Sequence, residues 1–322
     1  MVSRPRRSLR RALLAALVTA SVAVPVSAAA RPAAVPAPAP AVLAPLRDAS
    51  PAALKERYAA HRAGIRAAER AATAHGDRAR AATLRAMADP ARRFLAFDGR
   101  DGGRTAEVVG DLARAERIAV LVPGSDTSLD TYGRLRAGAV ALQRELSGRT
   151  AVIAWLGYGT PGTFSTAALT PARADSAAPR LRAFVGELRA ARPAARTSLV
   201  CHSYGAVVCA RAAPGLPVAD IVLYGSPGAG AADHVGALRT GATVWAGRGT
   251  RDWIADVPHV RLPLGFATVG LGTDPLAKRF GARPFDAGSA GHGDYLAPRS
   301  TSLRNIARIV RGATPAQEGR HA

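Results

Sequence analysis

Cysteine, lysine and aromatic residues are scarce in this sequence, and each scarcity argues against a class of protein. Two cysteines in 322 residues exclude a disulfide-rich scaffold, and without clustered histidines they make no zinc site. Aromatic residues make up 5% of the chain, and no basic stripe interleaved with aromatics marks a dedicated nucleic-acid-binding module. We therefore expect no nucleic-acid partner, no metal and no organic cofactor.

Acidic residues are also few. The chain has 23 of them against 44 lysines and arginines, of which only Lys55 and Lys278 are lysines, and its formal net charge is +21. Five arginines and no acids lie in the first eleven residues, so the rest of the chain carries +16. The arginines are scattered, which also fits a GC-rich coding bias. At most, this charge favours weak association with an anionic cell envelope.

A long apolar run occurs near the N-terminus. The basic stretch "MVSRPRRSLRR" precedes "ALLAALVTASVAVPV", and "VSAAA" then offers the small residues that a signal peptidase reads. This pattern predicts a signal peptide over residues 1–30 and a secreted protein, by the general secretory route or, given the paired arginines, the twin-arginine route. The run is too short for a membrane span, and we find no other transmembrane candidate.

Composition changes along the chain predict four further segments. Residues 31–48 form an Ala/Pro-rich extended linker that can hardly build a core. Residues 49–92 are Ala-, Arg- and Glu-rich, and we expect two helices there, broken near Gly76 and docked on the main domain because their apolar stripes are narrow. The main domain spans residues 93–313, and residues 314–322 are a disordered tail.

The main domain alternates short apolar runs with helix-length stretches. The expected strands are "RFLAFD", "TAEVVGD", "RIAVLVPG", "TAVIAWLGY", "TSLVCHS", "DIVLYGSP" and "ATVWAGR", and a helix in "STSLRNIARIVRG" closes the domain. This alternation predicts an α/β fold with a mostly parallel, doubly wound sheet. Its functional site is expected beyond the carboxyl ends of the strands.

The stretch "TSLVCHSYGAVVCA", residues 197–210, nearly matches the G-x-S-x-G nucleophile elbow around Ser203. Gly205 fills the second glycine position, whereas Cys201 replaces the first. The strand–turn–helix context is the one that the motif requires. The alternative is a buried crossover whose serine hydroxyl is satisfied by the backbone.

A serine nucleophile needs a base and a group that orients the base. Asp252 follows the strand "ATVWAG", and His292 lies between two glycines in a polar loop, "SAGHGDYL". The order Ser203, Asp252, His292 is the chain order of the α/β-hydrolase triad. Asp233 and Asp256 are better explained than Asp252 as solvated loop residues. His202 is expected to point away from the site.

Stabilisation of an oxyanion requires backbone donors near the nucleophile. The strand "RIAVLVPG" ends in "PGSDTS", a glycine turn at the same edge of the sheet. We predict that the N–H groups of Ser125 and Tyr204 form the oxyanion hole. The nearby Asp126 and Asp130 are alternatively helix caps.

These motifs together resemble an actinobacterial α/β-hydrolase family, the domain of unknown function 1023. The matching segments are "AVLVPGSDTSLDTY", "VIAWLGYGTP", "CHSYGAVV", "IVLYGSPGAG", "DPLAKRFGARPF" and "GHGDYL". The resemblance spans about residues 93–312 and implies the α/β-hydrolase fold, with Ser203 as nucleophile, Asp252 as acid and His292 as base. Cys201 in place of glycine and Gly293 in place of a frequent serine depart from the family pattern.

The sequence thus indicates a serine hydrolase that cleaves carboxylic esters of a small-molecule or surface-bound acyl substrate. The alternatives are an amidase or acyltransferase with the same residues, or a catalytically silent envelope-binding protein. A long loop after "TAVIAWLGY", with Phe164 in it, is either a flap over the site or a plain surface loop.

The two cysteines lie eight residues apart, on the strand and the helix that flank the elbow. Export would expose them to an oxidising compartment. We predict a disulfide between Cys201 and Cys209 that clamps the elbow. The alternative is a pair of reduced, buried cysteines that act as small apolar residues.

Overall fold

The computed structural model describes residues 35–259, 262–263 and 268–315. Its helices are α2 (Pro51–His75), α3 (Arg78–Met87), α4 (Tyr132–Leu146), α5 (Ala172–Ala191), α6 (Tyr204–Ala212) and α7 (Thr301–Arg311), with short 3₁₀ turns at Thr166–Leu169, Val235–Leu238 and Trp253–Asp256. Its strands are β1 (Arg93–Asp98), β2 (Arg104–Gly110), β3 (Arg117–Val122), β4 (Thr150–Leu156), β5 (Arg196–His202), β6 (Asp220–Tyr224), β7 (Thr243–Gly247), β8 (Leu262–Pro263), β9 (Thr268–Val269) and β10 (Arg283–Pro284).

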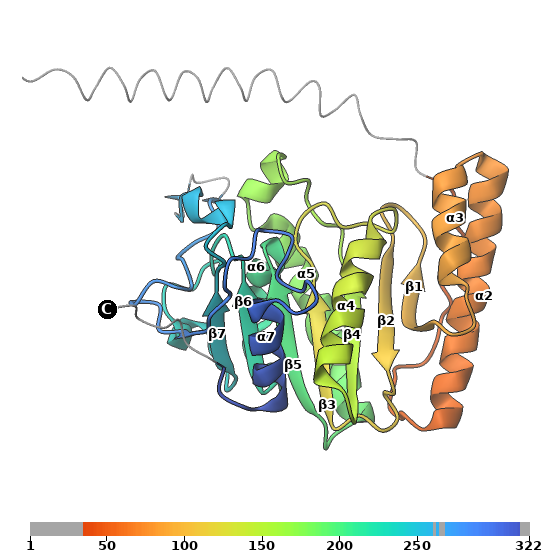
Figure 1. The fold of residues 1–322 in the computed structure, drawn as a ribbon. Coiled ribbons are helices and arrows are strands. Elements are labelled where there is room, and N and C mark those ends of the chain that lie inside the picture. The colour runs from red at the N-terminus through yellow and green to blue at the C-terminus, as the bar shows by residue number, and fades with distance from the viewer. Residues whose placement is uncertain (1–34, 260–261, 264–267, 316–322) are drawn as a thin grey trace, which may run out of the picture. The chain divides into compact units, whose positions relative to one another are not determined.

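An eight-stranded sheet organises the domain (Figure 1). The strand order is β1-β2-β4-β3-β5-β6-β7-β10. β1 and β2 pair antiparallel with each other, as do β2 and β4, and all later pairs are parallel. The chain moves from β3 to β4 on one side and to β5 on the other, so the topological switch point lies between β3 and β5. The predicted fold class is confirmed.

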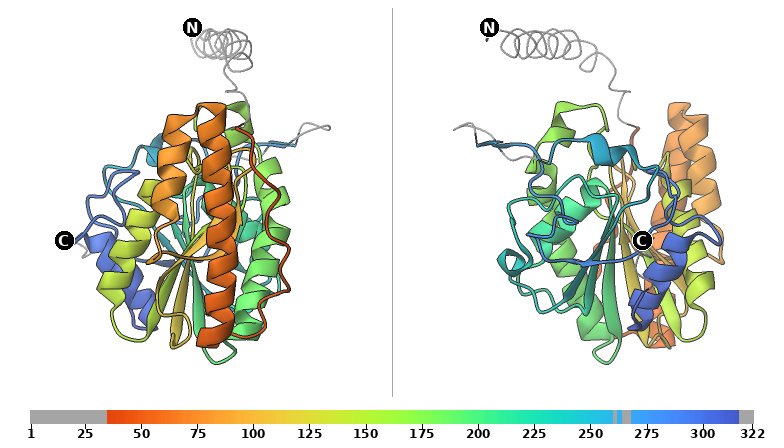
Figure 2. Two further views of the ribbon diagram at one scale, coloured as in Figure 1. Left: turned by 90° about the vertical axis from the view of Figure 1, so that its right-hand side faces the viewer. Right: turned by 60° about the vertical axis from the view of Figure 1, so that its left-hand side comes forward.

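Helices cover both faces of this sheet (Figure 2). α5 and α6 contribute to one apolar cluster and α4 and α7 to a second, with side chains of the central strands divided between the two. The central strands read as continuous apolar runs because both of their faces are buried; all seven residues of β4 are buried.

The helical segment before the sheet consists of α2 and α3, and α2 lies along β1 at the edge of the sheet (Figure 1). α2 ends at Gly76, which adopts a left-handed φ of 85°. In α3, the buried guanidinium of Arg80 binds Asp130 through two hydrogen bonds of 2.5 and 2.8 Å. This pair ties the helical segment to the loop after β3.

The Ala/Pro-rich linker is extended where the structure describes it, but its end belongs to the core. Leu46 is buried, and its backbone N–H donates to Glu187 of α5 at 3.0 Å. The expectation that this stretch can hardly build a core was therefore wrong at its C-terminal end. Leu46 joins the core cluster, whereas Val42 and Leu43 of the same stretch remain exposed.

Some predicted segments lie outside the described residues: the signal peptide at 1–30, the first residues of the linker, and residues 316–322 of the tail. Across the described ranges, no helix combines the length and hydropathy that a membrane crossing needs. The two-residue strands β8, β9 and β10 were not predicted, because so short a strand leaves no periodic pattern.

Candidate active site

Ser203 occupies the turn between β5 and α6. Its φ of 52° and ψ of −128° lie in a region that non-glycine residues rarely adopt. Such a conformation costs about 1–3 kcal/mol and persists only where surrounding contacts enforce it. The backbone N–H of Ser203 donates to Tyr224 of β6 at 3.1 Å, which is one of these contacts.

Two glycines allow the chain to pass close to Ser203. A Cβ at Gly205 would lie 2.5 Å from the carbonyl oxygens of Val122 and Pro123, so the start of α6 touches the end of β3. A Cβ at Gly124 would lie 2.5 Å from the Cβ of Ser203 and 3.1 Å from its Oγ. The turn after β3 therefore lies directly against the serine side chain.

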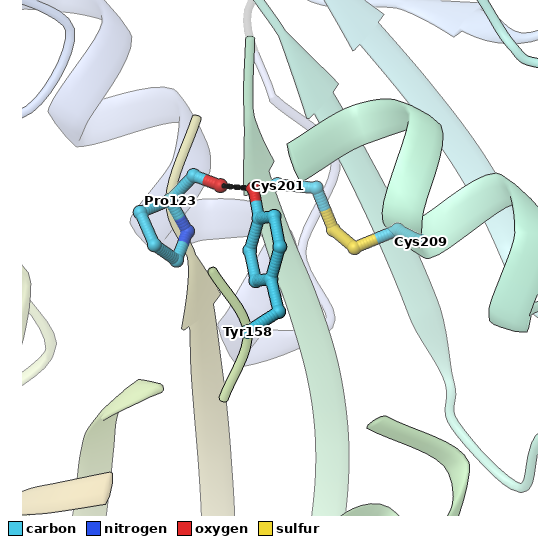
Figure 3. Close-up of a disulfide and its surroundings, with 4 residues drawn as sticks. All are labelled: Pro123, Tyr158, Cys201 and Cys209. Carbon is cyan, nitrogen blue, oxygen red and sulfur yellow. Dashed lines mark hydrogen bonds between the residues drawn. A yellow bond between two sulfur atoms is a disulfide. The ribbon is translucent and has the colours of Figure 1, made fainter. Parts of the chain in front are cut away.

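A disulfide begins at Cys201, the position where the elbow motif has its first glycine (Figure 3). Cys201 near the end of β5 is bonded to Cys209 in the second turn of α6, with their Cα atoms 6.5 Å apart. Both side chains are fully buried. In the same core cluster, the hydroxyl of Tyr158 donates to Pro123 at 2.7 Å, beside the disulfide in Figure 3. The bond joins the strand before Ser203 to the helix after it.

The thiol content of protein that was exported to an oxidising compartment before purification tests this bond. Denatured, unreduced protein is expected to give close to no free thiol per chain with a chromogenic thiol reagent, and two after reduction, because Cys201 and Cys209 are the only cysteines. Close to two thiols before reduction would contradict the disulfide.

His292 lies between Ser203 and Asp252. Its Nε2 is 2.9 Å from the Oγ of Ser203, and its Nδ1 is 2.8 Å from Oδ1 of Asp252. With the ring proton on Nδ1, that nitrogen donates to the carboxylate and Nε2 accepts the hydrogen bond of the serine hydroxyl. The arrangement can therefore transfer a proton from the hydroxyl to the imidazole.

Asp252 is buried and accepts two further hydrogen bonds. Tyr295 donates its hydroxyl to Oδ2 at 2.5 Å, and the N–H of Ile254 donates to Oδ1 at 2.9 Å. Burial raises the pKa of Asp252, but the hydrogen bonds from His292, Tyr295 and Ile254 outweigh it and hold the pKa below its ordinary value. The carboxylate therefore stays ionised at neutral pH.

A glycine makes room for this carboxylate. A Cβ at Gly225, which follows β6 with a φ of 55°, would lie 2.9 Å from Oδ2 of Asp252 and 3.1 Å from the ring of Tyr295. Sequence reasoning missed both Gly225 and Tyr295. The only available signal was their proximity to other motifs: Tyr295 follows His292 by three residues, and Gly225 begins the "GSPG" turn.

The side chain of His202 was predicted to point away from the site, and this was wrong. Its ring lies 4.7 Å from the ring of His292, and its Nε2 is 2.8 Å from the carbonyl oxygen of His292. The alternation of side chains along β5 places Cys201 in one core cluster and His202 on the opposite face, where the His292 loop lies. Trp253 also contacts His292, with ring centroids 4.7 Å apart.

A profile of the alpha/beta hydrolase family matches residues 98–262, which is half of the chain and includes Ser203 and Asp252. The chain belongs to the alpha/beta hydrolase family.

Several proteins are similar to this alpha/beta hydrolase. It is 30% identical to the uncharacterized protein Rv2079 of Mycobacterium tuberculosis over 251 residues, which cover 68% of this chain and 38% of that protein. It is 34% identical to the uncharacterized protein Rv0963c of the same organism over 178 residues, 48% of this chain and 66% of the other. The chain thus spans well under half the length of the first of these relatives.

Solved structures with a similar fold include XC6422 from Xanthomonas campestris, described as an α/β serine hydrolase without lid. It is 20% identical, with a TM-score of 0.44, and the match covers 70% of this chain and 97% of that one. Esterase LipW from Mycobacterium marinum is 18% identical, with a TM-score of 0.41 over 76% of this chain and 88% of that one.

The loop between β4 and α5 of this alpha/beta hydrolase is anchored at the elbow. The hydroxyl of Tyr204 donates to the carbonyl of Thr170 at 2.6 Å and accepts from the N–H of Ala174 at 3.3 Å. The same loop carries Phe164, whose side chain is 99% exposed and lines the cavity that contains Ser203. The loop therefore borders the candidate active site.

His202 makes the stability of this hydrolase depend on pH. Burial, reinforced by the nearby His292, lowers the pKa of His202 to about 3, below its ordinary value of 6.5. As pH falls below 6.5, the unfolded chain binds a proton that the folded chain excludes, so stability is lost. Between pH 6.5 and 4.5 this histidine is expected to remove about 2 kcal/mol from the free energy of unfolding.

Urea denaturation at both pH values measures this effect. His202→Gln keeps an N–H donor but does not titrate, so its loss of stability between pH 6.5 and 4.5 should be smaller by that amount. His75→Gln, at an exposed position near the end of α2, is the matched control and should keep the wild-type slope. Equal slopes for all three proteins would contradict the prediction.

Proposed function

We propose that this protein is a serine hydrolase that cleaves carboxylic esters through an acyl-enzyme intermediate, with Ser203, His292 and Asp252 as its catalytic triad. The observation that carries the proposal is the continuous hydrogen-bonded line from Oγ through both nitrogens of His292 to a buried carboxylate. The strained turn at Ser203 supports it, because such strain clusters at active sites.

In the proposed mechanism, Oγ of Ser203 attacks the ester carbonyl while Nε2 of His292 takes the hydroxyl proton. The tetrahedral intermediate collapses, the C–O bond to the alcohol breaks, and His292 returns its proton to the leaving oxygen. Water then attacks the acyl-enzyme, with His292 again as base, and releases the acid and free Ser203. Asp252 holds the imidazole in its tautomer and stabilises the imidazolium throughout.

The proposed oxyanion hole consists of the backbone N–H groups of Ser125 and Tyr204. The contact of Gly124 with Ser203 and the contact of Gly205 with the end of β3 support it, since they bring both segments beside Oγ. Tyr204 is also the first residue of α6, so the positive end of the helix dipole favours a negative charge there. Loss of one such donor typically costs about 3–4 kcal/mol in the barrier.

A fluorophosphonate probe tests the proposal without knowledge of the substrate, because it reacts with activated serines. Wild-type protein is expected to be labelled at a single residue, Ser203, and Ser203→Ala to remain unlabelled. Heat-denatured protein is the control for non-specific reaction. Absence of labelling in folded wild-type protein would favour the alternative of a silent envelope-binding protein. Comparison of ester, amide and acyl-acceptor substrates would then separate an esterase from an amidase or acyltransferase.

We also propose that the protein is exported. The N-terminal pattern of basic, apolar and small residues supports this, and so does the Cys201–Cys209 disulfide, because such bonds persist in oxidising compartments. Mass spectrometry of the protein recovered from culture medium tests it: a mature N-terminus near residue 31 is expected, and retention of the full chain inside the cell would contradict export.

A further inference from the structure

Ser203 and His292 open into a cavity of about 1000 Å³. The lining includes one side of α4 and residues of the segment 293–299 that follows His292. α4 starts at the edge of the sheet that carries the active site and runs away from it (Figure 1). We call the part of this cavity that runs along α4 the α4 trough.

Apolar and small side chains line the middle of the α4 trough. On α4 they are Ala137, Gly138 and Ala141, which recur at the three- and four-residue spacing of one helix face. Leu296 packs directly on this face of α4, because its Cδ1 would lie 2.8 Å from a Cβ at position 138. The stretch of α4 from residue 134 to residue 144 corresponds to about 15 Å of helix. An apolar surface of this length, in a cavity that opens at Ser203, fits an extended acyl chain.

Unpaired arginines line the trough around its apolar part. Arg134, Arg144 and Arg299 are exposed and form no ion pair within the described residues, whereas Arg136 of the same helix binds Glu107 at 3.2 Å. Arg134, on the first turn of α4, lies close enough to the active site to help lower the pKa of His202.

The lining sets two acidic side chains against these three unpaired arginines. Asp126 accepts the N–H of Thr163 at 3.2 Å and keeps its negative charge, and Glu145 lies at the far end of α4. Unpaired arginines outnumber the carboxylates of the lining, so the cavity is suited to an anionic group, and the charge of Arg134 reaches the active site.

We infer that the substrate is an anionic ester of a long unbranched acyl chain, with the chain in the α4 trough and the negative group of the alcohol part against Arg134. This inference rests on the proposed function and adds the substrate class to it. A phosphate or a carboxylate on the alcohol would satisfy the arginine equally well.

Chain-length preference tests the trough. Wild-type kcat/KM for p-nitrophenyl dodecanoate is expected to exceed that for the acetate by at least tenfold, since each buried methylene contributes up to about fourfold. Ala137→Trp should lower this dodecanoate-to-acetate ratio about tenfold. Ala137 is exposed, so the larger side chain leaves the fold intact, and Ala141→Leu provides a second obstruction. Ala190→Trp, on an exposed face of α5 outside the cavity, is the matched control and should keep the wild-type ratio.

Charge preference is tested with 1-dodecanoylglycerol and its 3-phosphate, with dodecanoate release as the measurement. Wild-type kcat/KM should be higher for the phosphate, and Arg134→Gln should reduce that preference about tenfold, the scale of a lost charge-assisted contact. Arg189→Gln, an exposed arginine of α5 outside the cavity, is the control.

The inference would be overturned if the wild type preferred the acetate or the neutral glyceride. It would also be overturned if Ala137→Trp and Arg134→Gln left these ratios unaltered. In both cases ester hydrolysis itself would stand. Failure to hydrolyse any ester, together with absence of fluorophosphonate labelling, would instead count against the proposed function.

Discussion

Ser203→Ala is expected to reduce kcat for p-nitrophenyl butyrate by about a million-fold, and His292→Ala by a similar factor. The physical reason is that neither residue works without the other. The serine hydroxyl is a poor nucleophile until Nε2, 2.9 Å away, accepts its proton, and without the serine the imidazole has no nucleophilic hydroxyl to deprotonate. Steady-state hydrolysis by each purified variant measures the effect.

The double variant sharpens this prediction. If the two residues act as one unit, Ser203→Ala combined with His292→Ala should be no slower than either single variant. Losses that multiply would show that the two residues act independently, contrary to the mechanism. Far-ultraviolet circular dichroism is the control for folding. Both side chains lie at the carboxyl edge of the sheet rather than inside its layers, so we expect the variants to fold like the wild type.

Asp252→Asn is expected to lower kcat about ten-thousandfold while the protein remains folded. An asparagine side chain can present an N–H to Nδ1 of His292, which favours the tautomer with its proton on Nε2, and that nitrogen then cannot accept the serine proton. The same esterase assay measures it. Asp256→Asn is the matched control: Asp256 is exposed and lies in the same 3₁₀ turn, so its activity should stay within about twofold of wild type, as for surface substitutions in general. If Asp252→Asn were nearly as active as wild type and Asp256→Asn were inactive, the assignment of Asp252 as the catalytic acid would be wrong.

The central sheet was predictable because its strands are buried on both faces. Continuous apolar runs such as those of β3 and β4 have few other interpretations when helix-length stretches separate them. The two helices before the sheet were predictable as well, since Gly76 and Asp77 mark the break between them and Asp77 caps the second. The strand β10 could not be predicted, because two residues carry no pattern and pair with β7 only through the tertiary fold.

The site residues that could be predicted from the sequence are those that directly follow a strand. Ser203 and Asp252 follow β5 and β7, and the parallel order of the sheet brings these ends to one edge. Tyr295 and His202 required information that only the folded chain contains. Tyr295 reaches a carboxylate 43 residues away, and the ring of His202 contacts a loop 90 residues away. No local pattern specifies partners at such separations.

The burial of the disulfide decides when it must form. Exchange with an oxidoreductase passes through a mixed disulfide, so the enzyme has to touch a sulfur atom. Cys201 and Cys209 are fully enclosed between β5 and α6, and the folded domain offers no such access. Oxidation therefore has to accompany the docking of strand and helix. A recombinant chain that folds in a reducing cytosol would keep two inaccessible thiols, and later treatment with an oxidant would not repair them without unfolding.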